Sequence, residues 1–258
     1  MTMRLATFNV NSVRTRMPIL QRWLPESGTD LLFLQETKVV DADFPAEPFE
    51  AMGYKVWFRG EKSYNGVAVV AREGLDVSVA FGFEDGEDPD FATRVALART
   101  GALTVLNTYV PQGKSIDHPD FEVKKSFLDR TRKIIEREKG ALFAWVGDLN
   151  VAPTEADVTN PGNKKNHVCF HISIREHFDR TAEGLSDVLR LFRPEPGEYT
   201  FFDYRVKDAL ARNIGWRIDH VLATPSLVER ARDSFVDREP RGWERPSDHT
   251  PLLADFDL

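Results

Sequence analysis

The stretch Ala141-Leu142-Phe143-Ala144-Trp145-Val146-Gly147-Asp148-Leu149-Asn150 joins an apolar run to a polar end. An apolar run of this kind is typical of a buried strand. Asp and Asn are poor strand formers, so strand propensity does not explain why the run ends in Asp148 and Asn150. Two interpretations are open. Gly-Asp and Asn are common in turns, whereas residues that break a local rule are also expected at functional sites.

Similar apolar runs, separated by turn residues, lie on both sides of this stretch along the chain. Those between residues 54 and 110 follow each other directly and predict an antiparallel meander. The predicted strands cover residues 4–10, 31–34, 54–58, 66–71, 75–79, 94–98, 102–110, 141–147, 199–204, 216–223 and 251–256.

Helical periodicity is clearest over residues 120–139, where apolar side chains such as Phe127 and Ile134 share one face. Because strands are numerous and helices are few and well separated, the pattern favours two packed sheets with helices outside. We expect one domain over residues 1–258. Further helices are predicted over residues 18–24, 185–192 and 225–232, and loops over 41–48 and 154–183.

The composition is that of a globular protein without a membrane segment. Of the 258 residues, 41% are hydrophobic and 29% charged, and no apolar run approaches transmembrane length. The N-terminus has no apolar region of a signal peptide. The single cysteine, Cys169, excludes an internal disulfide, and no motif surrounds it, which favours a packed thiol over a nucleophile. We therefore expect a cytoplasmic protein with no membrane partner.

Net charge does not decide whether the protein binds nucleic acid. The formal charge is −7, whereas binding to a phosphate backbone needs a positive face. Part of the acid is concentrated in residues 84–90, and each basic cluster is either a solvated face or a nucleic-acid contact. These clusters are Lys124, Lys125, Arg130, Arg132 and Lys133; Lys164 and Lys165; and Arg205, Lys207, Arg212 and Arg217.

Predicted strands repeatedly end in an acid, an amide, a phenol or a histidine. Strand ends of stacked sheets gather at one rim, so these side chains are candidates for one site. Taken singly, each also fits a cap, a turn residue or a satisfied core polar group. The residues are Asn9, Asn11, Glu36, Tyr109, Asp148, Asn150, Asp219, His220, Asp248 and His249.

These side chains favour one kind of chemistry. Carboxylate and carboxamide oxygens suit Mg²⁺ or Mn²⁺, and the sequence has no Cys-His spacing for zinc. A histidine beside a carboxylate supplies a general base near neutral pH. No serine lies in a nucleophile-elbow motif, and no Gly-rich loop precedes a helix. Metal-assisted attack of water on a phosphate ester fits best.

Six motifs in the sequence carry a resemblance to a known family, and they appear in the same order as in that family. They are Thr7-Phe8-Asn9-Val10-Asn11-Ser12-Val13-Arg14, Leu34-Gln35-Glu36-Thr37-Lys38, Asn107-Thr108-Tyr109-Val110-Pro111-Gln112-Gly113, Gly147-Asp148-Leu149-Asn150, Trp216-Arg217-Ile218-Asp219-His220 and Ser247-Asp248-His249-Thr250-Pro251. The second, third and fifth are the most specific. From about Arg4 to the C-terminus, the chain resembles the exonuclease III family of apurinic/apyrimidinic (AP) endonucleases, within the endonuclease/exonuclease/phosphatase superfamily.

The resemblance implies a four-layer α/β sandwich, in which two packed mixed β-sheets are flanked by helices. It also implies a Mg²⁺- or Mn²⁺-dependent enzyme that hydrolyses the phosphodiester 5′ of an abasic site and leaves a 3′-hydroxyl. 3′→5′ exodeoxyribonuclease and 3′-phosphatase or 3′-phosphodiesterase activities are expected beside it. The implied partner is double-stranded DNA with abasic sites or blocked 3′ ends. We expect a monomer, associated with the nucleoid if the source is prokaryotic.

For the metal, the resemblance implies that Glu36 is a ligand of one or two ions, with Asn11 and Asp248 nearby. Asn9 would orient Asp148 or the metal shell. Asp148 would position and deprotonate the attacking water and would also approach the metal. Position 11 is Asn here, whereas some relatives have Asp, which would weaken or shift metal binding.

For the phosphate, the resemblance implies that Asp219 orients His249, which binds the scissile phosphate or acts as the base. The base is therefore either Asp148 or His249. Asn150 and Tyr109 would contact the phosphate and stabilise its developing charge. Asn150 and His249 are also expected among the residues around the metal.

For DNA, the resemblance implies an apolar pocket for the flipped base-less sugar, formed by Phe201, Trp216 and Ile218. Ordinary core packing is the alternative for these side chains. Arg205 matches a residue that probes the duplex near the lesion, and Arg217 is a further expected DNA contact. Gln112 and Lys114 are candidate phosphate contacts. The loop over residues 160–178, with its three histidines, departs from the family pattern and leaves the balance between abasic sites and 3′ ends open.

Two other functions are alternatives. A superfamily phosphatase that acts on a small phosphate ester or a phosphoinositide uses the same Asp, Asn and His set, but lacks the Trp-Arg-Ile-Asp and Tyr-Val-Pro-Gln-Gly segments. An inactive DNA-binding module predicts the loss of at least one catalytic residue. None is lost among Glu36, Asp148, Asn150, Asp219 and His249.

Overall fold

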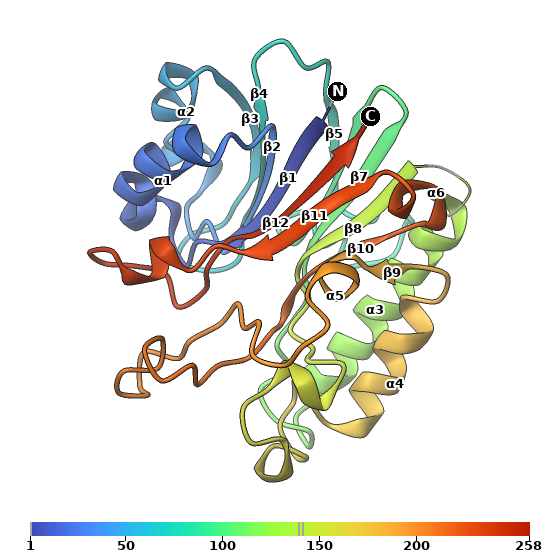
Figure 1. Cartoon of the computed structure of the whole chain (residues 1–258). Helices are drawn as coiled ribbons and strands as arrows, with labels where there is room; N and C mark the ends of the chain where they lie inside the picture. Colours follow the sequence, from blue (N-terminus) through green and yellow to red (C-terminus); the bar gives the residue numbers. More distant parts are fainter. Residues whose placement is uncertain (1, 139, 141) are drawn as a thin grey trace.

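The computed structural model describes residues 2–138, 140 and 142–258. Two six-stranded sheets stack face to face, and helices cover the outer face of each sheet (Figure 1). This arrangement confirms the expected four-layer α/β sandwich. The predicted helix end at Lys139 and strand start at Ala141 lie outside the described residues.

The first sheet contains both ends of the described chain. Its strands are β1 (Thr2–Asn9), β2 (Leu31–Gln35), β3 (Tyr54–Arg59), β4 (Val67–Arg72), β11 (Ala231–Val236) and β12 (Leu252–Asp257). Their order is β11-β12-β1-β2-β4-β3. Among the described residues of this sheet, β1 and β2 are parallel neighbours and the other pairs are antiparallel.

The second sheet has the same mixed character. Its strands are β5 (Ser78–Phe81), β6 (Val95–Thr100), β7 (Leu103–Tyr109), β8 (Leu142–Asp148), β9 (Ser186–Asp187) and β10 (Asp219–Ala223). Their order is β5-β6-β7-β8-β10-β9, with β7 and β8 parallel at the centre. A parallel pair at the centre of each sheet means that neighbouring strands end at the same edge.

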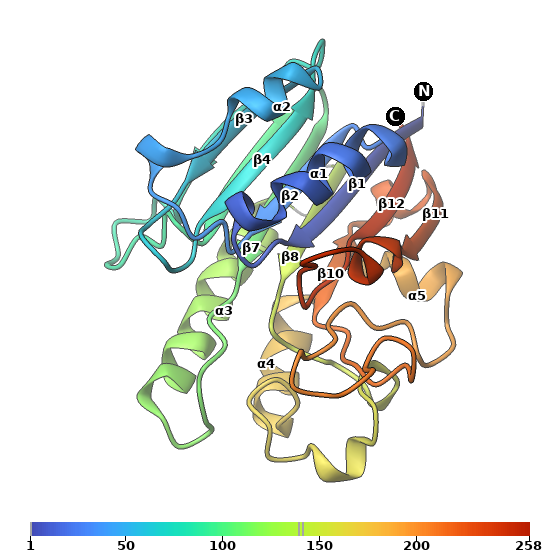
Figure 2. The same cartoon turned by 90° about the vertical axis from the view of Figure 1, so that its left-hand side faces the viewer.

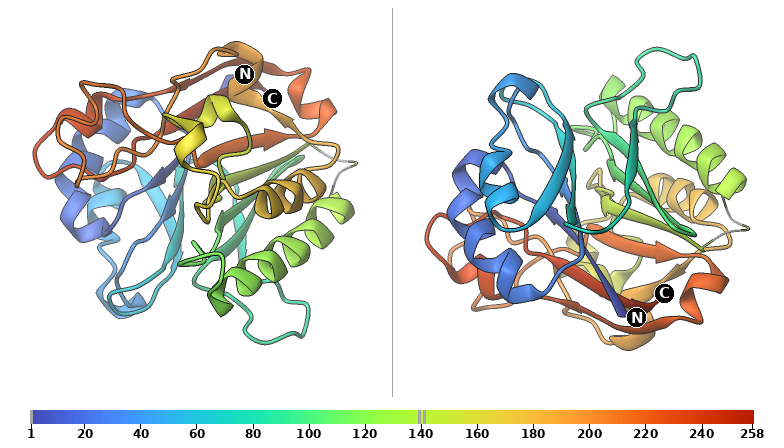
Figure 3. Two further views of the ribbon diagram at one scale, coloured as in Figure 1. Left: turned by 90° about the horizontal axis from the view of Figure 1, so that it is seen from below. Right: turned by 90° about the horizontal axis from the view of Figure 1, so that it is seen from above.

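Helices form the two outer layers (Figures 2 and 3). The helices α1 (Val13–Ser27) and α2 (Glu47–Ala51) pack on the first sheet, and α3 (Pro119–Glu138) and α4 (Ile172–Thr181) on the second. Of two short helices, α5 (Val188–Phe192) contacts β11 of the first sheet and β10 of the second, and α6 (Pro225–Val228) contacts β8. Among the described residues, no helix combines the length and apolar character needed to cross a membrane.

The inner core lies between the sheets and explains the apolar runs of the sequence. Leu5 and Phe33 of the first sheet share an apolar cluster with Val105 and Val146 of the second, and all are buried. Because the opposite faces of these strands are covered by helices, the strands are apolar on both sides. Each such side chain contributes about 1.5–3 kcal/mol by leaving water. This core holds the two sheets, and therefore their polar edges, together.

The predicted meander over residues 54–110 is wrong. The strands β3 and β4 pair in the first sheet, whereas β5, β6 and β7 pair in the second. The chain crosses between the sheets after Arg72. Hydrophobic periodicity identifies strands but not their partners, and consecutive strands pair only about two-thirds of the time.

Other boundaries also differ from prediction. Packing of Val13 and Met17 extends α1 five residues before Pro18, and residues 172–181 of the expected long loop form α4. Residues 225–232 give only a four-residue helix, because residues 231–236 pair with β12 as an edge strand. Within residues 199–204 there is no strand, and Phe201 is an isolated bridge partner of both Trp216 and His249. The loop there is what carries the apolar side chains to the site.

Candidate active site

The mixed register of the two sheets brings the polar strand ends to one edge. Asn9 is paired with Gln35 at the ends of parallel β1 and β2, so Glu36 follows beside Asn9. In the second sheet Asp148 is the register partner of both Tyr109 and Asp219. The predicted convergence of these strand ends is therefore present in the structure.

The conformation of Gly147 explains the glycine of the Gly-Asp-Leu-Asn segment. Its φ is +130°, and a Cβ atom there would lie 2.0 Å from the carbonyl oxygen of Thr108 on the neighbouring strand. Any larger residue would push β8 away from β7. Gly147 thus sets the position of the Asp148 carboxylate relative to Tyr109.

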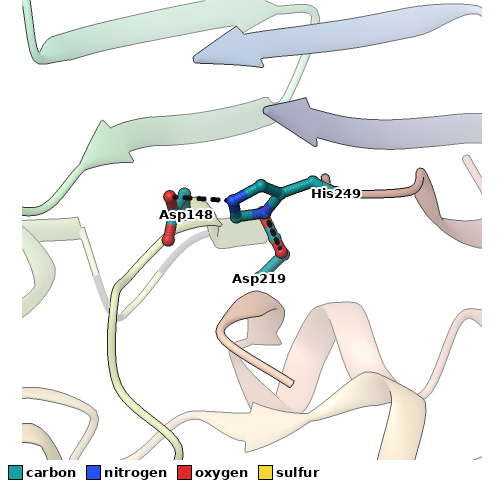
Figure 4. Close-up of side chains that lie close together, drawn as sticks. All are labelled: Asp148, Asp219 and His249. Atoms are coloured by element: carbon teal, nitrogen blue, oxygen red, sulfur yellow. Dashed lines mark hydrogen bonds and ion pairs between the residues drawn. The ribbon is translucent and has the colours of Figure 1, made fainter. Parts of the chain in front are cut away.

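His249 lies between two buried carboxylates (Figure 4). Its Nδ1 atom is 2.8 Å from Oδ2 of Asp219, and its Nε2 atom is 3.8 Å from Oδ2 of Asp148. Burial disfavours the imidazolium, but the two carboxylates outweigh this effect and raise the pKa of His249 to about 10. Burial also raises the pKa of Asp148 to about 7, although His249 opposes this shift. The histidine is therefore cationic at neutral pH, and Asp148 is poised to exchange a proton.

Asn9 joins the two sheets through hydrogen bonds to two acids. Its Nδ2 atom donates to Oε1 of Glu36 at 2.8 Å and to Oδ2 of Asp148 at 2.9 Å. Since Glu36 follows the first sheet and Asp148 ends a strand of the second, one carboxamide fixes their separation. This geometry fits the orienting role predicted for Asn9, in which its amide nitrogen rather than a ligand oxygen faces the acids.

A lysine ammonium marks the part of the site that attracts cations. Lys38 Nζ lies 2.7 Å from Oε2 of Glu36 and 2.6 Å from Oδ1 of Asn11, and Asn11 donates to Oδ1 of Asp248 at 3.0 Å. Burial favours the neutral acid, but the Lys38 charge prevails and lowers the pKa of Glu36. Lys38 belongs to the Leu-Gln-Glu-Thr-Lys motif, yet sequence alone assigned it no role.

The donor set fits a hard divalent cation. Asp148, Asp219 and His249 each offer a ligand atom within 4.8 Å of the others, and Glu36 and Asp248 lie at the same edge. Oδ1 of Asp219 is buried without a hydrogen-bond partner among the described residues, so a strong acceptor there is free. Carboxylate oxygens with no thiolate ligand suit Mg²⁺ or Mn²⁺.

Several of these residues adopt backbone conformations that a side chain rarely takes. The φ angles of Asn11, Glu36, Lys38 and Asn150 lie between 43° and 54°. Such strain costs of order 1–3 kcal/mol per residue and persists where the surrounding structure enforces it. Its presence at four residues that follow the strand ends is consistent with the functional interpretation, although other positive-φ residues lie in loops elsewhere.

Tyr109 ends β7, Asn150 follows β8, and both line the cavity. Burial, together with the negative charges of Glu36 and Asp148, raises the pKa of Tyr109 well above its ordinary value. The phenol therefore keeps its proton and can donate a hydrogen bond. Asn150 Nδ2 donates to the carbonyl of Val110 at 2.9 Å, which fixes the carboxamide beside Asp148.

A cavity of about 510 Å³ opens beside these groups. The three predicted pocket residues Phe201, Trp216 and Ile218 all line it, and the Phe201 ring lies 5.0 Å from the His249 ring. The remaining lining residues are Glu36, Tyr109, Gln112, Asp148, Asn150, Lys164, His167, Cys169, Asp203, Arg205, Asp248 and His249.

Three of these lining residues had no predicted role at the site, namely His167, Cys169 and Asp203, and Lys164 was predicted only as part of a basic cluster. The His167 ring lies 4.5 Å from the Trp216 ring, and partial burial followed by the charges of Lys124 and Lys164 lowers the pKa of His167 to about 4. A neutral imidazole therefore covers one side of the indole at pH 7. The resemblance relates the loop of His167 to substrate preference, but the loop has no sustained periodicity, so the sequence does not show which of its residues reach the cavity.

The predicted DNA contacts divide into accessible and buried residues. Gln112 and Arg205 are exposed at the cavity, where Arg205 pairs with Asp203 at 2.7 Å. Lys114 is exposed in a neighbouring hollow and pairs with Asp120 at 2.8 Å.

The prediction for Arg217 is wrong in this structure. Its guanidinium is buried and bonds to Asp157 at 2.7 Å and Asp187 at 2.6 Å. His220 lies beside it and bonds to the carbonyl of Val151, away from the cavity. Both residues belong to a polar network inside the fold, in which the Arg217 guanidinium also lies 3.1 Å from Nδ1 of His220.

Comparison with known proteins agrees with this architecture. Two stacked mixed sheets with acids, amides and a histidine at one edge define a class of phosphate-ester hydrolases. The chain belongs to the endonuclease/exonuclease/phosphatase family, whose model matches residues 6–249.

Individual relatives are similar along their whole length. Exodeoxyribonuclease III of Haemophilus influenzae is 34% identical, with 98% of this chain and all of that protein covered. The solved structure of an AP endonuclease from Archaeoglobus fulgidus is 44% identical with a TM-score of 0.95, covering 99% of this chain and all of the other. A 3′ phosphatase from Neisseria, solved with a product DNA hairpin, is 36% identical with a TM-score of 0.92, over 99% of this chain and 100% of that one.

Proposed function

We propose that the protein is a DNA-repair AP endonuclease that hydrolyses the phosphodiester 5′ of an abasic site in duplex DNA and leaves a 3′-hydroxyl. 3′→5′ exodeoxyribonuclease and 3′-phosphatase or 3′-phosphodiesterase activities accompany this reaction. The observation that carries the proposal is His249, held between Asp219 and Asp148 at the wall of a cavity lined by Phe201, Trp216 and Ile218. The names of similar proteins, exodeoxyribonuclease III, AP endonuclease and 3′ phosphatase, support it.

The enzyme is divalent-metal dependent, and we propose Mg²⁺ or Mn²⁺ as the ion. Glu36 would hold it, with Asp248, Asn11 and Asp148 nearby. When bound, the ion supplies positive charge that offsets the negative charge developing on the phosphate. Asn9 keeps the Glu36 and Asp148 carboxylates apart at a fixed distance through its two hydrogen bonds.

The pKa shifts favour Asp148 as the base and His249 as the phosphate-binding cation. His249, whose pKa is about 10, carries a positive charge at pH 7 and cannot accept another proton. Asp148, whose pKa is about 7, is able to take a proton from the attacking water. Tyr109 and Asn150 complete the site by donating hydrogen bonds to phosphate oxygens.

The cavity selects a nucleotide without a base. Phe201, Trp216 and Ile218 offer an apolar surface for the sugar, and flipping costs least where no base is stacked. Arg205 contacts the duplex near the lesion, and Gln112 and Lys114 bind flanking phosphates. Their exposure at or near the cavity supports these roles.

We propose that one chain acts as a monomer and as a single domain over residues 1–258. Glu36 comes from the first sheet and Asp148 from the second, so neither half of the chain holds the whole site. Duplex DNA with abasic sites or blocked 3′ ends is the proposed partner. Such a substrate places the enzyme in the cytoplasm beside the nucleoid, if the source is prokaryotic.

The decisive test is an incision assay on an end-labelled duplex with one tetrahydrofuran abasic analogue. Incision 5′ of the analogue with Mg²⁺, and none with EDTA, is expected. The same duplex with a normal base is the control for damage recognition, and a nicked duplex with a 3′-phosphate tests the accompanying activity. Absence of incision together with phosphate release from a small phosphomonoester or inositol phosphate would contradict the proposal.

A further inference from the structure

Among the residues that the structure describes, the buried ammonium of Lys124 bonds to main-chain carbonyl groups alone. Its sequence neighbourhood is basic, with Lys125 beside it, and predicts either a solvated face or a DNA contact. The structure contradicts both, because Lys124 is fully buried on the inner face of α3. A charge removed from water needs a compensating role, since its burial without partners is costly.

The partners of this ammonium come from three separate segments. Nζ donates to the carbonyl oxygen of Asn150 at 2.7 Å, of Val168 at 2.9 Å and of Gln112 at 3.1 Å. An ammonium has three N–H groups, so none remains for DNA. Gln112 follows β7, Asn150 follows β8, and Val168 lies in the loop before α4. One side chain therefore ties together three segments beyond the end of the paired strands β7 and β8.

All three segments form walls of the cavity. Gln112 and Asn150 line it directly, and Val168 lies between two lining residues, His167 and Cys169. Asn150 has a φ of 50°, a conformation that needs support from its surroundings. The Lys124 hydrogen bond to its carbonyl is the shortest of the three and supplies such support.

Gly113 shows that this contact is closely fitted. A Cβ atom at this position would lie 3.4 Å from Cδ of Lys124 and 3.3 Å from the Phe121 ring. The absence of a side chain lets the Gln112–Gly113 segment approach the lysine stem. The close approach of Gly113 thus places the Lys124 side chain directly behind the cavity wall that Gln112 lines.

We propose that Lys124 is a positioning residue that acts through Asn150: it holds the carboxamide in place for the scissile phosphate and does not itself touch DNA. This inference rests on the proposed function in so far as Asn150 contacts the phosphate. It predicts an effect on the chemical step rather than on DNA binding, because Lys124 has no donor left for a phosphate.

The kinetic test compares Lys124→Met with Lys133→Met, a substitution on the same helix at a side chain that is 60% exposed. We expect Lys124→Met to lower kcat for abasic-site incision about 10- to 100-fold with KM changed less than about 3-fold, since small misplacements cost this much. Lys133→Met should leave both constants unchanged. A rise in KM with normal kcat would overturn the proposal, because it would make Lys124 a DNA contact.

A double-mutant cycle with Asn150→Ala asks whether Lys124 acts through Asn150. If it does, adding Lys124→Met to Asn150→Ala lowers kcat by less than about 3-fold, because residues that act as a unit are not additive. Multiplying effects would overturn the proposal. Lys124→Gln keeps an N–H donor in place of the ammonium, so its kcat should lie between those of wild type and Lys124→Met. If Lys124→Met does not fold, Lys124→Gln takes its place in the cycle.

Hydrogen–deuterium exchange followed by mass spectrometry gives a readout independent of activity. Lys124→Met or Lys124→Gln should raise exchange in peptides that cover residues 110–113, 149–151 and 167–169, while the β-sheet peptides stay protected. Unchanged exchange in these peptides would overturn the positioning role even if the protein cleaves no DNA. A wild type that fails to incise, with raised exchange in the variant, would instead count against the proposed function alone.

Discussion

The Nδ1 atom of His249 lies 2.8 Å from Oδ2 of Asp219, and both residues are buried. A carboxylate at neutral pH only accepts hydrogen bonds, so Nδ1 carries the proton that is shared in this contact. The ring orientation is thereby fixed, and Nε2 faces Asp148 and the cavity. One buried acid thus determines where the imidazolium charge is presented.

Asp219→Asn should lower both the pKa of His249 and the incision rate. The substitution keeps the shape but removes a charge that raises the pKa of His249 to about 10. We expect this pKa to fall by more than one unit, worth at least about 1.4 kcal/mol, and kcat to fall at least about 100-fold. NMR titration of His249 and single-turnover incision measure the two effects. An unchanged histidine titration would mean that Asp219 does not set its charge.

Asp148→Asn should abolish incision yet stabilise the metal-free protein. Because burial raises the pKa of Asp148 to about 7, its ionisation in the fold is unfavourable. A raised carboxyl pKa contributes stability at low pH that is lost as pH rises from about 4 to 7, so the neutral amide is favoured at pH 8. We expect a melting temperature in EDTA at least about 3 °C above wild type at pH 8, and no gain at pH 4. A loss of stability at pH 8 would contradict this account.

The sequence predicted the strands and the polar strand ends well, because both depend on local patterns. Apolar runs such as residues 142–148 are buried on two sides, and Asp148 and Asn150 break strand propensity where the site lies. The resemblance of the motifs then supplied the sandwich fold and the family, and the comparisons confirm both.

What failed depends on contacts between distant segments. The pairing of β3 and β4 apart from β5–β7 is decided by the inner core. The helix α4 is amphipathic, with Ile174 and Phe178 buried, but it is short and lies in a polar segment. Arg217 and Lys124 look like surface cations in sequence, and only the positions of Asp157 and of three carbonyl groups show why each is buried. His167 lines the cavity from a loop without sustained periodicity, so the sequence did not show which residue of this loop reaches the site.

Asp157→Asn should destabilise the fold and flatten its acid dependence. Burial opposes ionisation of Asp157, but Arg217 and Arg190 prevail and lower its pKa to about 2. A lowered pKa gives stability that is present above about pH 4 and is lost as pH falls towards 2, here worth about 2 kcal/mol. Removal of the charge also leaves Arg217 short of a partner, so we expect a loss of about 3 kcal/mol at pH 7. Urea unfolding at pH 7, 4 and 2.5 measures both effects.

The control for this substitution is Asp129→Asn, at a side chain that is 54% exposed and lies 3.6 Å from His177. Exposed pairs of this kind contribute little, so its unfolding free energy should stay within about 0.5 kcal/mol of wild type. Equal losses in the two variants would show that the buried network has no special importance.

Glu36→Gln should weaken metal binding without unfolding the protein. Lys38 already pairs with Glu36 at 2.7 Å, which shows that the site attracts positive charge. A ligand that binds only the folded state raises its stability, so Mg²⁺ should increase the melting temperature of the wild type and not that of the variant. Incision should need at least about 10-fold more Mg²⁺ in Glu36→Gln. Glu122→Gln, at a side chain that is 73% exposed, is the matched control. A wild-type metal response in Glu36→Gln would remove Glu36 from the ligand set.

The pH dependence of incision should identify the base. If Asp148 accepts the proton and His249 binds phosphate as a cation, kcat/KM rises with pH up to about 7 and falls again near pH 10. A bound divalent cation adds positive charge beside Asp148 and moves the acid limb lower, whereas the alkaline limb stays above pH 8. If His249 were the base, it would have to lose its proton first, and the rate would keep rising towards pH 10. Asp219→Asn should move the alkaline limb to lower pH, because it lowers the pKa of His249. A bell-shaped profile of kcat/KM whose alkaline limb shifts in Asp219→Asn identifies Asp148 as the base. A profile of kcat/KM that rises through pH 9 identifies His249 as the base.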